Sequence, residues 1–114
     1  MSKKVSPVHP GEILFEEFMK PLGLTMNKLA LELHVPTTRI AEIVHGRRAI
    51  TSDTALRLSV YFGTTPEFWM NLQASYDLEV TRDKQLAKIK REVRPAEIAA
   101  GARVAATPAF RTAS

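Results

Sequence analysis

The chain has 114 residues, contains no cysteine and carries a formal net charge of +4. This length suits one domain with one core, and the lack of cysteine excludes disulfides and thiolate metal sites. No apolar run approaches the ~18 residues that a membrane span needs, and the charged start of the chain lacks the apolar run of a signal peptide. We therefore expect a soluble cytoplasmic protein, and the basic excess favours an anionic partner such as nucleic acid.

The chain is predicted to begin with a flexible arm over residues 1–8, followed by a helix that starts at Pro10. Proline suits the first helical position because its missing N–H is not needed there. Proline disfavours helical backbone in the residue before it, so we expect this helix to stop at Lys20, before Pro21. Gly23 then predicts a turn. The apolar face of the helix is formed by Ile13, Leu14, Phe15 and Phe18.

Two short helices are predicted next. Thr25 is a suitable N-cap for the second helix, Pro36 is placed to open the third, and Gly46 is placed to end it. Small and large apolar residues recur at helical spacing in both segments. They are Leu29, Ala30 and Leu33 in the second helix, and Ile40, Ile43 and Val44 in the third.

Start and stop signals also mark a fourth and a fifth helix. The fourth begins near Thr51 and ends at Gly63, and the fifth begins with Thr65 and Pro66 and is expected to run to about Arg82. Their apolar residues are Ala55, Leu56, Leu58 and Phe62, then Phe68, Trp69, Leu72 and Tyr76. No segment alternates with the period of a strand. The sequence therefore predicts an all-α, five-helix domain over residues 9–82.

A C-terminal extension over residues 83–114 differs from this domain in composition. Leu86, Ile89 and Val93 keep a helical stripe among basic residues, and the segment after Pro95 is rich in alanine with few large apolar groups. Such a composition cannot bury a core of its own. We expect a partly helical extension with a disordered end.

The segment Met26–His45 has the pattern of a helix-turn-helix, in which two helices cross steeply around a tight turn. Ala30 is small where the second helix must cross closely, and Val35 fills the space under the turn. The same pattern could belong to any two packed helices. The polar outer face of the second helix favours insertion into a DNA major groove instead. That face carries Thr37, Thr38, Arg39, Ala41 and Glu42.

Basic residues extend this candidate surface. Arg39 has the donor geometry for a two-bond contact with guanine, and Arg47 and Arg48 follow the third helix directly, where arginines can bind phosphate oxygens. A solvated basic loop is the plainer interpretation of that arginine pair. His45 is expected either to contact phosphate or to interact with the dipole at the helix end.

A homodimer is expected because a single helix-turn-helix buries too little surface for tight specific binding, and two copies match a palindromic operator. The fifth helix has a wider apolar face than a core requires. We assign Phe68 and Leu72 to the core and Trp69, Met70 and Tyr76 to the dimer interface, since aromatics and methionine are enriched in such surfaces. The stripe of the extension is a further candidate for the contact.

Two other classes of function fit the sequence less well. An enzyme is not indicated, because the sequence has no metal-binding motif, no cysteine nucleophile and no glycine-rich phosphate loop, so we expect neither a cofactor nor a metal. A protein-binding adaptor would need exposed apolar anchors on the third helix, where the sequence has polar side chains.

Three strings carry a resemblance to a known family: the segment beginning at His9 (HPGEIL), the segment 42–51 (EIVHGRRAIT) and the segment 55–73, from ALRL to FGTTPEFWMNLQ. Together they resemble the HigA-type antitoxins, also called the VapI or addiction-module antidote family, over about residues 8–82. This family lies within the phage-repressor-like helix-turn-helix proteins.

The resemblance implies a DNA-binding domain that dimerises, represses its own operon and neutralises a HigB-like toxin, an mRNA endonuclease. It also implies that Thr37, Thr38, Arg39 and Glu42 face the bases, and that Arg47 and Arg48 form the family's basic loop. His34 stands where most such sequences have the glycine of the turn. Histidine tolerates the left-handed backbone better than most residues, so we expect the turn to survive. A stand-alone phage-like repressor without a toxin is the alternative.

Overall fold

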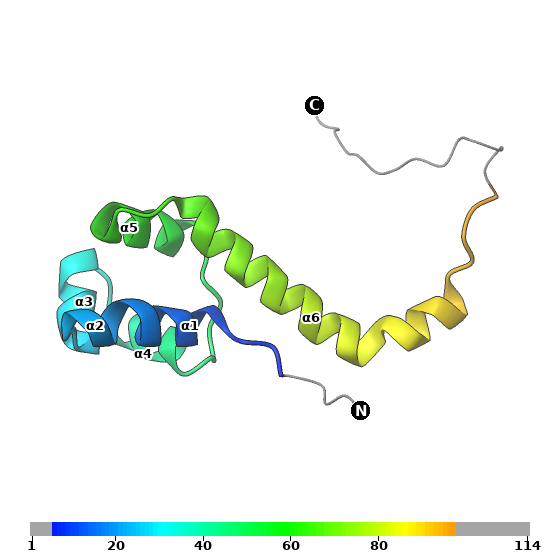
Figure 1. Ribbon diagram of the computed structural model, residues 1–114, viewed down its shortest axis with the longest axis horizontal. Coiled ribbons are helices and arrows are strands. Elements are labelled where there is room, and N and C mark those ends of the chain that lie inside the picture. Colours follow the sequence, from blue (N-terminus) through cyan, green and yellow to red (C-terminus); the bar gives the residue numbers. More distant parts are fainter. Residues whose placement is uncertain (1–5, 98–114) are drawn as a thin grey trace. The chain divides into compact units, whose positions relative to one another are not determined.

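The computed structural model describes residues 6–97, which form helices joined by short loops without any strand in that range (Figure 1). The chain divides into two compact units, residues 1–84 and 85–114. In chain order the elements are α1 (Pro10–Ile13), the π-helical turn η1 (Leu14–Met19), α2 (Lys20–Leu22), α3 (Met26–Leu33), α4 (Thr37–Val44), α5 (Ser52–Phe62) and α6 (Pro66–Glu92). The first three are consecutive and together form the first predicted helix, so the all-α, five-helix prediction is confirmed.

The first helix does not stop at Lys20 as the sequence analysis expected. It continues through Pro21 to Leu22 and ends at Gly23, whose φ of 66° is left-handed. The π-turn is the physical reason, because the N–H of Lys20 bonds to the carbonyl of Phe15, five residues earlier. Proline has no N–H and its ring collides with the carbonyl four residues back in a regular α-helix. The wider turn changes that spacing, and the helix passes the proline.

The N-terminus of α1 packs against the backbone of α4. His9 is the N-cap, and its Nδ1 accepts a hydrogen bond of 2.9 Å from the N–H of Gly11. That bond requires the neutral imidazole, and partial burial lowers the pKa of His9 from its ordinary value, although nearby Asp77 acts in the opposite direction. Gly11 is buried, and a Cβ added there would collide with the carbonyl oxygen of Ile43. The two helices can therefore approach this closely only where α1 has no side chain.

The helix-turn-helix is formed by α3 and α4. Thr25 caps α3 as predicted, with its Oγ1 accepting from the N–H of Lys28 at 3.0 Å. His34 adopts the left-handed conformation, with φ 60° and ψ 48°, which confirms that histidine takes the glycine position of the turn. Pro36 is the residue before α4 rather than its first helical residue, so α4 begins at Thr37, one residue later than predicted.

The core lies between these helices and the start of α6. Leu29, Ala30, Leu33, Ile40 and Ile43 are buried as expected, whereas Val35 and Val44 are partly buried against them. The buried cluster is made of Leu14, Met19, Leu29, Ala30, Leu33, Ile40, Ile43, Ile50, Ala55, Leu58 and Trp69. Phe18 and Phe62 pack against this cluster with ring centroids 4.9 and 6.5 Å from that of Trp69. The aromatic side chains thus hold the beginning of α6 on the first helix.

Two assignments on the fifth helix were wrong. Trp69, predicted at a dimer interface, is fully buried, and its Nε1 donates to Thr64 Oγ1 at 2.7 Å. Phe68, predicted in the core, is 37% exposed. Neighbouring residues on a helix point about 100° apart, so the start of α6 at Pro66 determines which aromatic ring faces the core. The sequence shows that this helix has a wide apolar face, but it does not show which part of that face is turned toward the core.

The fifth helix is also longer than expected, because α6 continues past Arg82 to Glu92. A change in composition led us to expect a boundary at Asp83, but charged residues continue a helix as readily as apolar ones. Residues 93–97 are not helical. The expected arm and the expected disordered end fall largely on residues 1–5 and 98–114, which lie outside the described residues.

The contact at Gly11 generates a test of the fold. Gly11→Ala should lower the free energy of unfolding by about 3 kcal/mol, because α1 and α4 must separate to admit a methyl group against backbone. Gly23→Ala is the matched control: its site has open space and a left-handed backbone, so we expect a loss of about 1–2 kcal/mol from conformation alone. Denaturant unfolding measures both, and a Gly11→Ala loss no greater than that of Gly23→Ala would contradict the packing argument.

Candidate functional site

The outer face of α4 and the loop that follows it form the candidate site. Ile40 and Ile43 are buried, which leaves Thr37 and Thr38 exposed at the N-terminus of α4 and Glu42 half-buried. The polar face expected from the sequence is therefore turned outward at the start of the helix.

The end of α4 shapes the basic loop. Gly46 has a φ of 75°; its N–H bonds to Ile43 O at 3.0 Å, and the N–H of Arg47 bonds to Glu42 O at 2.7 Å. This pair of bonds is the Schellman arrangement that terminates a helix at glycine. It turns the chain sharply at Gly46, and His45 before this glycine and Arg47 and Arg48 after it are all exposed.

Arg39 is not a freely extended side chain. It is 27% exposed, and its Nη1 donates to Asp53 Oδ2 at 2.8 Å and to Thr54 Oγ1 at 3.4 Å. These contacts hold Arg39 against the N-terminal turn of α5. Arg39 was expected on the outer face, but its contact with Asp53 was not, because these two residues are fourteen positions apart.

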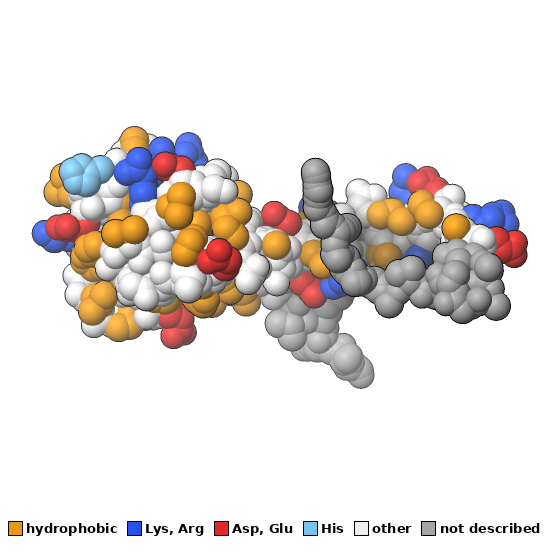
Figure 2. Space-filling view, turned by 90° about the horizontal axis from the view of Figure 1, so that it is seen from above, with side chains coloured by type: hydrophobic (Ala, Val, Ile, Leu, Met, Phe, Trp, Pro, Cys, Tyr) orange, Lys and Arg blue, Asp and Glu red, His pale blue; other side chains and the backbone are white. Residues whose placement is uncertain are grey.

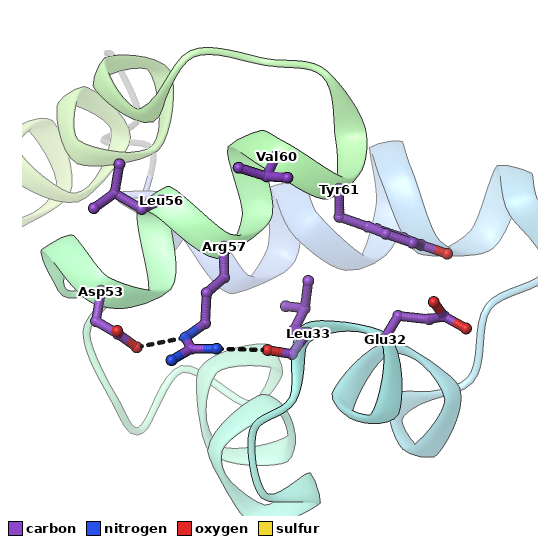
Figure 3. Close-up of a pocket in the computed structure, with 7 residues that line it drawn as sticks. All are labelled: Glu32, Leu33, Asp53, Leu56, Arg57, Val60 and Tyr61. Carbon is purple, nitrogen blue, oxygen red and sulfur yellow. Dashed lines mark hydrogen bonds and ion pairs between the residues drawn. The ribbon is translucent and has the colours of Figure 1, made fainter.

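Asp53 joins Arg39 to a second arginine. Its Oδ2 also accepts from Arg57 Nε at 2.9 Å, and Arg57 Nη1 donates to the carbonyl of Leu33 at 2.9 Å (Figure 3). Hydrogen bonds from Arg57 and then from Arg39 lower the pKa of Asp53 from its ordinary value. Neither Asp53 nor Arg57 was expected at the candidate surface, although their i, i+4 spacing is a visible ion-pair signal.

A second ion pair connects the helix to the loop. Arg48 Nε lies 2.9 Å from Glu42 Oε1. A hollow of about 340 Å³ is lined by Arg48 together with the residues of the Asp53 contacts, and most of its lining is basic or hydroxyl-bearing: Arg39, Arg48, Ala49, Thr51, Asp53, Thr54 and Arg57. The structure therefore brings two of the predicted arginines to one surface, while Arg47 and His45 lie in the adjoining loop.

A partly apolar groove lies between α3 and α5. Figure 2 views the first unit from the side on which α5 lies, and hydrophobic side chains gather on that face. The groove is lined by Glu32, Leu33, Asp53, Leu56, Arg57, Val60 and Tyr61 (Figure 3). Val60 is 84% exposed and Leu56 is 54% exposed, so two large aliphatic side chains of α5 face solvent.

Of the three residues assigned to a dimer interface, two keep some exposed surface. Met70 is half-buried against the core cluster, and Tyr76 is half-buried with its ring edge-on to that of His9 at 4.8 Å. Trp69 is buried and therefore does not belong to this surface. Leu78, 57% exposed on the same helix, was not singled out from the sequence.

Residues 6–97 contain no group of three or more histidine and acidic side chains that could hold a metal ion. No helix in the same range combines the length and the apolar character needed to cross a membrane.

Comparison with known proteins places this geometry in a family. A family model described as helix-turn-helix matches residues 15–69. Virulence-associated protein I of Dichelobacter nodosus is 53% identical over 83 residues, which are 72% of this chain and 77% of that protein.

Solved structures agree with both matches. An addiction module antidote protein of a HigA family from Coxiella burnetii superposes with a TM-score of 0.77 and 50% identity, covering 81% of this chain and all of that one. The antitoxin HigA of Pseudomonas aeruginosa, solved with the higBA promoter, gives a TM-score of 0.77 and 39% identity over 78% of this chain and 97% of that one. The chain belongs to the HigA-type antitoxin family of helix-turn-helix proteins.

Proposed function

We propose that this protein binds double-stranded DNA sequence-specifically through α4 and represses its own operon. The exposed N-terminus of α4 carries the proposal, together with the arginine loop that follows the helix, because the first residues of a recognition helix contact base edges. Related HigA of Pseudomonas aeruginosa was solved with a promoter, which supports the same partner here.

Each polar residue of this surface has a proposed task. Thr37, Thr38 and Arg39 face base edges, and Glu42 lies beside them while also pairing with Arg48. Phosphate oxygens are the proposed partners of the exposed loop residues His45, Arg47 and Arg48.

The basic loop tests the DNA surface directly. Arg47→Gln/Arg48→Gln should weaken binding to every DNA sequence, because two phosphate contacts are lost. The slope of log K against log salt should fall by about one unit for each contact, measured by fluorescence anisotropy between low and physiological salt. Arg82→Gln/Lys84→Gln on α6 is the charge-matched control and should leave the slope unchanged. An unaltered slope in the loop variant would remove these arginines from the interface.

A symmetric homodimer is the proposed working unit, with Met70 and Tyr76 of α6 at its interface. Two half-sites about one DNA turn apart, ~34–36 Å, would then match the two-fold symmetry of a palindromic operator. Trp69 takes no part in this proposal, since it completes the core of one chain.

Sedimentation tests the dimer. The protein should sediment as a dimer at micromolar concentration, and Met70→Glu should produce a monomer because a carboxylate would be buried at the interface. Circular dichroism confirms that the variant is folded. Leu31→Glu, at an exposed apolar position on α3, should remain dimeric. A wild-type monomer that binds a palindromic operator tightly would contradict the proposal.

Neutralisation of a HigB-like mRNA endonuclease toxin is the second proposed activity, and the antidote naming of the relative from Coxiella burnetii supports it. The groove on α5 adds a physical reason to expect a protein partner. Exposed aliphatic side chains such as Val60 and Leu56 are typical of surfaces that bind another protein rather than DNA.

Co-expression tests the toxin partner. The product of the gene beside this one should arrest growth when expressed alone, and co-expression of this protein should restore growth. Val60→Glu should lose that rescue, since it places a charge in the groove, while operator binding by the variant should remain normal. A harmless neighbouring product would favour a stand-alone repressor, and full rescue by Val60→Glu would exclude the groove.

A further inference from the structure

Arg39 is held at one end of its guanidinium group. Its hydrogen bonds to Asp53 and Thr54 both come from Nη1. Among residues 6–97 no other bond to this guanidinium is found, so the donors on Nε and Nη2 have no partner among the described residues. An arginine needs only two such donors, on one edge, to bind the O6 and N7 acceptors of guanine.

Asp53 is itself held by a second arginine. Arg57 donates to the same carboxylate oxygen and, through Nη1, to the carbonyl of Leu33 at the end of α3 (Figure 3). A continuous series of bonds therefore runs from the end of α3 through Arg57 and Asp53 to Arg39. The carboxylate is anchored to the helix-turn-helix rather than carried on a free side chain.

We propose that Asp53 is a positioning residue for base recognition: it holds the guanidinium of Arg39 by one amino group and leaves the other edge oriented for a guanine. This inference rests on the proposed DNA-binding function. A free arginine must give up several rotatable bonds when it binds, whereas an arginine held in place loses less conformational freedom. The carboxylate thus contributes to discrimination between bases without touching DNA.

A different result is expected if Asp53 acts only as a negative charge that repels the DNA phosphates. Removing the charge would then raise affinity for all DNA by one factor and leave the ratio between sequences unchanged. A positioning role predicts that the ratio itself falls. The two interpretations are therefore separated by comparing sequences rather than by measuring a single affinity.

The experiment uses the full chain with two DNA probes: the promoter segment directly upstream of its gene, and a scrambled segment of equal length and composition. Asp53→Asn should reduce the ratio of promoter to scrambled affinity about 5- to 10-fold, within the discrimination of one guanine contact, while affinity for scrambled DNA stays equal or rises. Glu67→Gln is the matched control. It also removes an exposed acid from the first turn of a helix, and it should leave the ratio unchanged.

A double-mutant cycle shows whether Asp53 acts through Arg39. Arg39→Ala should itself lower the ratio, and adding Asp53→Asn to it should lower the ratio no further. An equal loss in both backgrounds, or an unchanged ratio for Asp53→Asn alone, would overturn the inference. If Asp53→Asn does not fold, Arg57→Lys replaces it, because lysine keeps the charge but cannot hold both Asp53 and Leu33 in the same geometry.

The outcomes for the inference and for the proposed function are distinct. A wild-type protein that binds both probes equally would refute sequence-specific recognition itself. A wild-type protein that discriminates, with Asp53→Asn discriminating equally well, would refute only the positioning role.

Discussion

The contact between α1 and the backbone of α4 is the constraint on which the rest of the structure depends. Gly11 lies so close to the Ile43 carbonyl that no side chain fits between them. Because α1 covers this side of α4, the opposite side is left to solvent. The buried Ile40 and Ile43 and the exposed Thr37 and Thr38 are both consequences of that packing. The lack of a side chain at Gly11 thus helps to determine which face of α4 is exposed to a binding partner.

Polar contacts then connect this helix to the elements around it. The loop before α5 is fixed by Gln73, a buried residue of α6 whose Oε1 accepts from the N–H of Ile50 at 2.8 Å. At the other end of the same loop, Arg48 pairs with Glu42. The bond between Gln73 and Ile50 satisfies buried groups that would be costly to leave unpaired. Both contacts hold the basic loop in a defined position beside α4, so the fold and the candidate DNA surface share the same interactions.

Local chemistry explains what the sequence predicts correctly. Caps at Thr25 and Thr51, glycines after α4 and α5, and helical spacing of apolar residues all act within a few positions of one another. The left-handed His34 belongs to the same class, because its conformation follows from the tight turn between α3 and α4. The helix-turn-helix and the outward position of its polar residues could therefore be predicted without coordinates.

By itself, the sequence determined the order of the helices, the turn and the polar face, since these depend on backbone preferences and short-range periodicity. Only the tertiary structure decided which aromatic ring of α6 is buried, how the first helix passes Pro21, and that Arg39 meets Asp53. The rotation of a wide apolar helix, a π-turn and an ion pair across fourteen residues each depend on how separate elements pack. No local rule contains that information, because the partners are brought together only by the folded core.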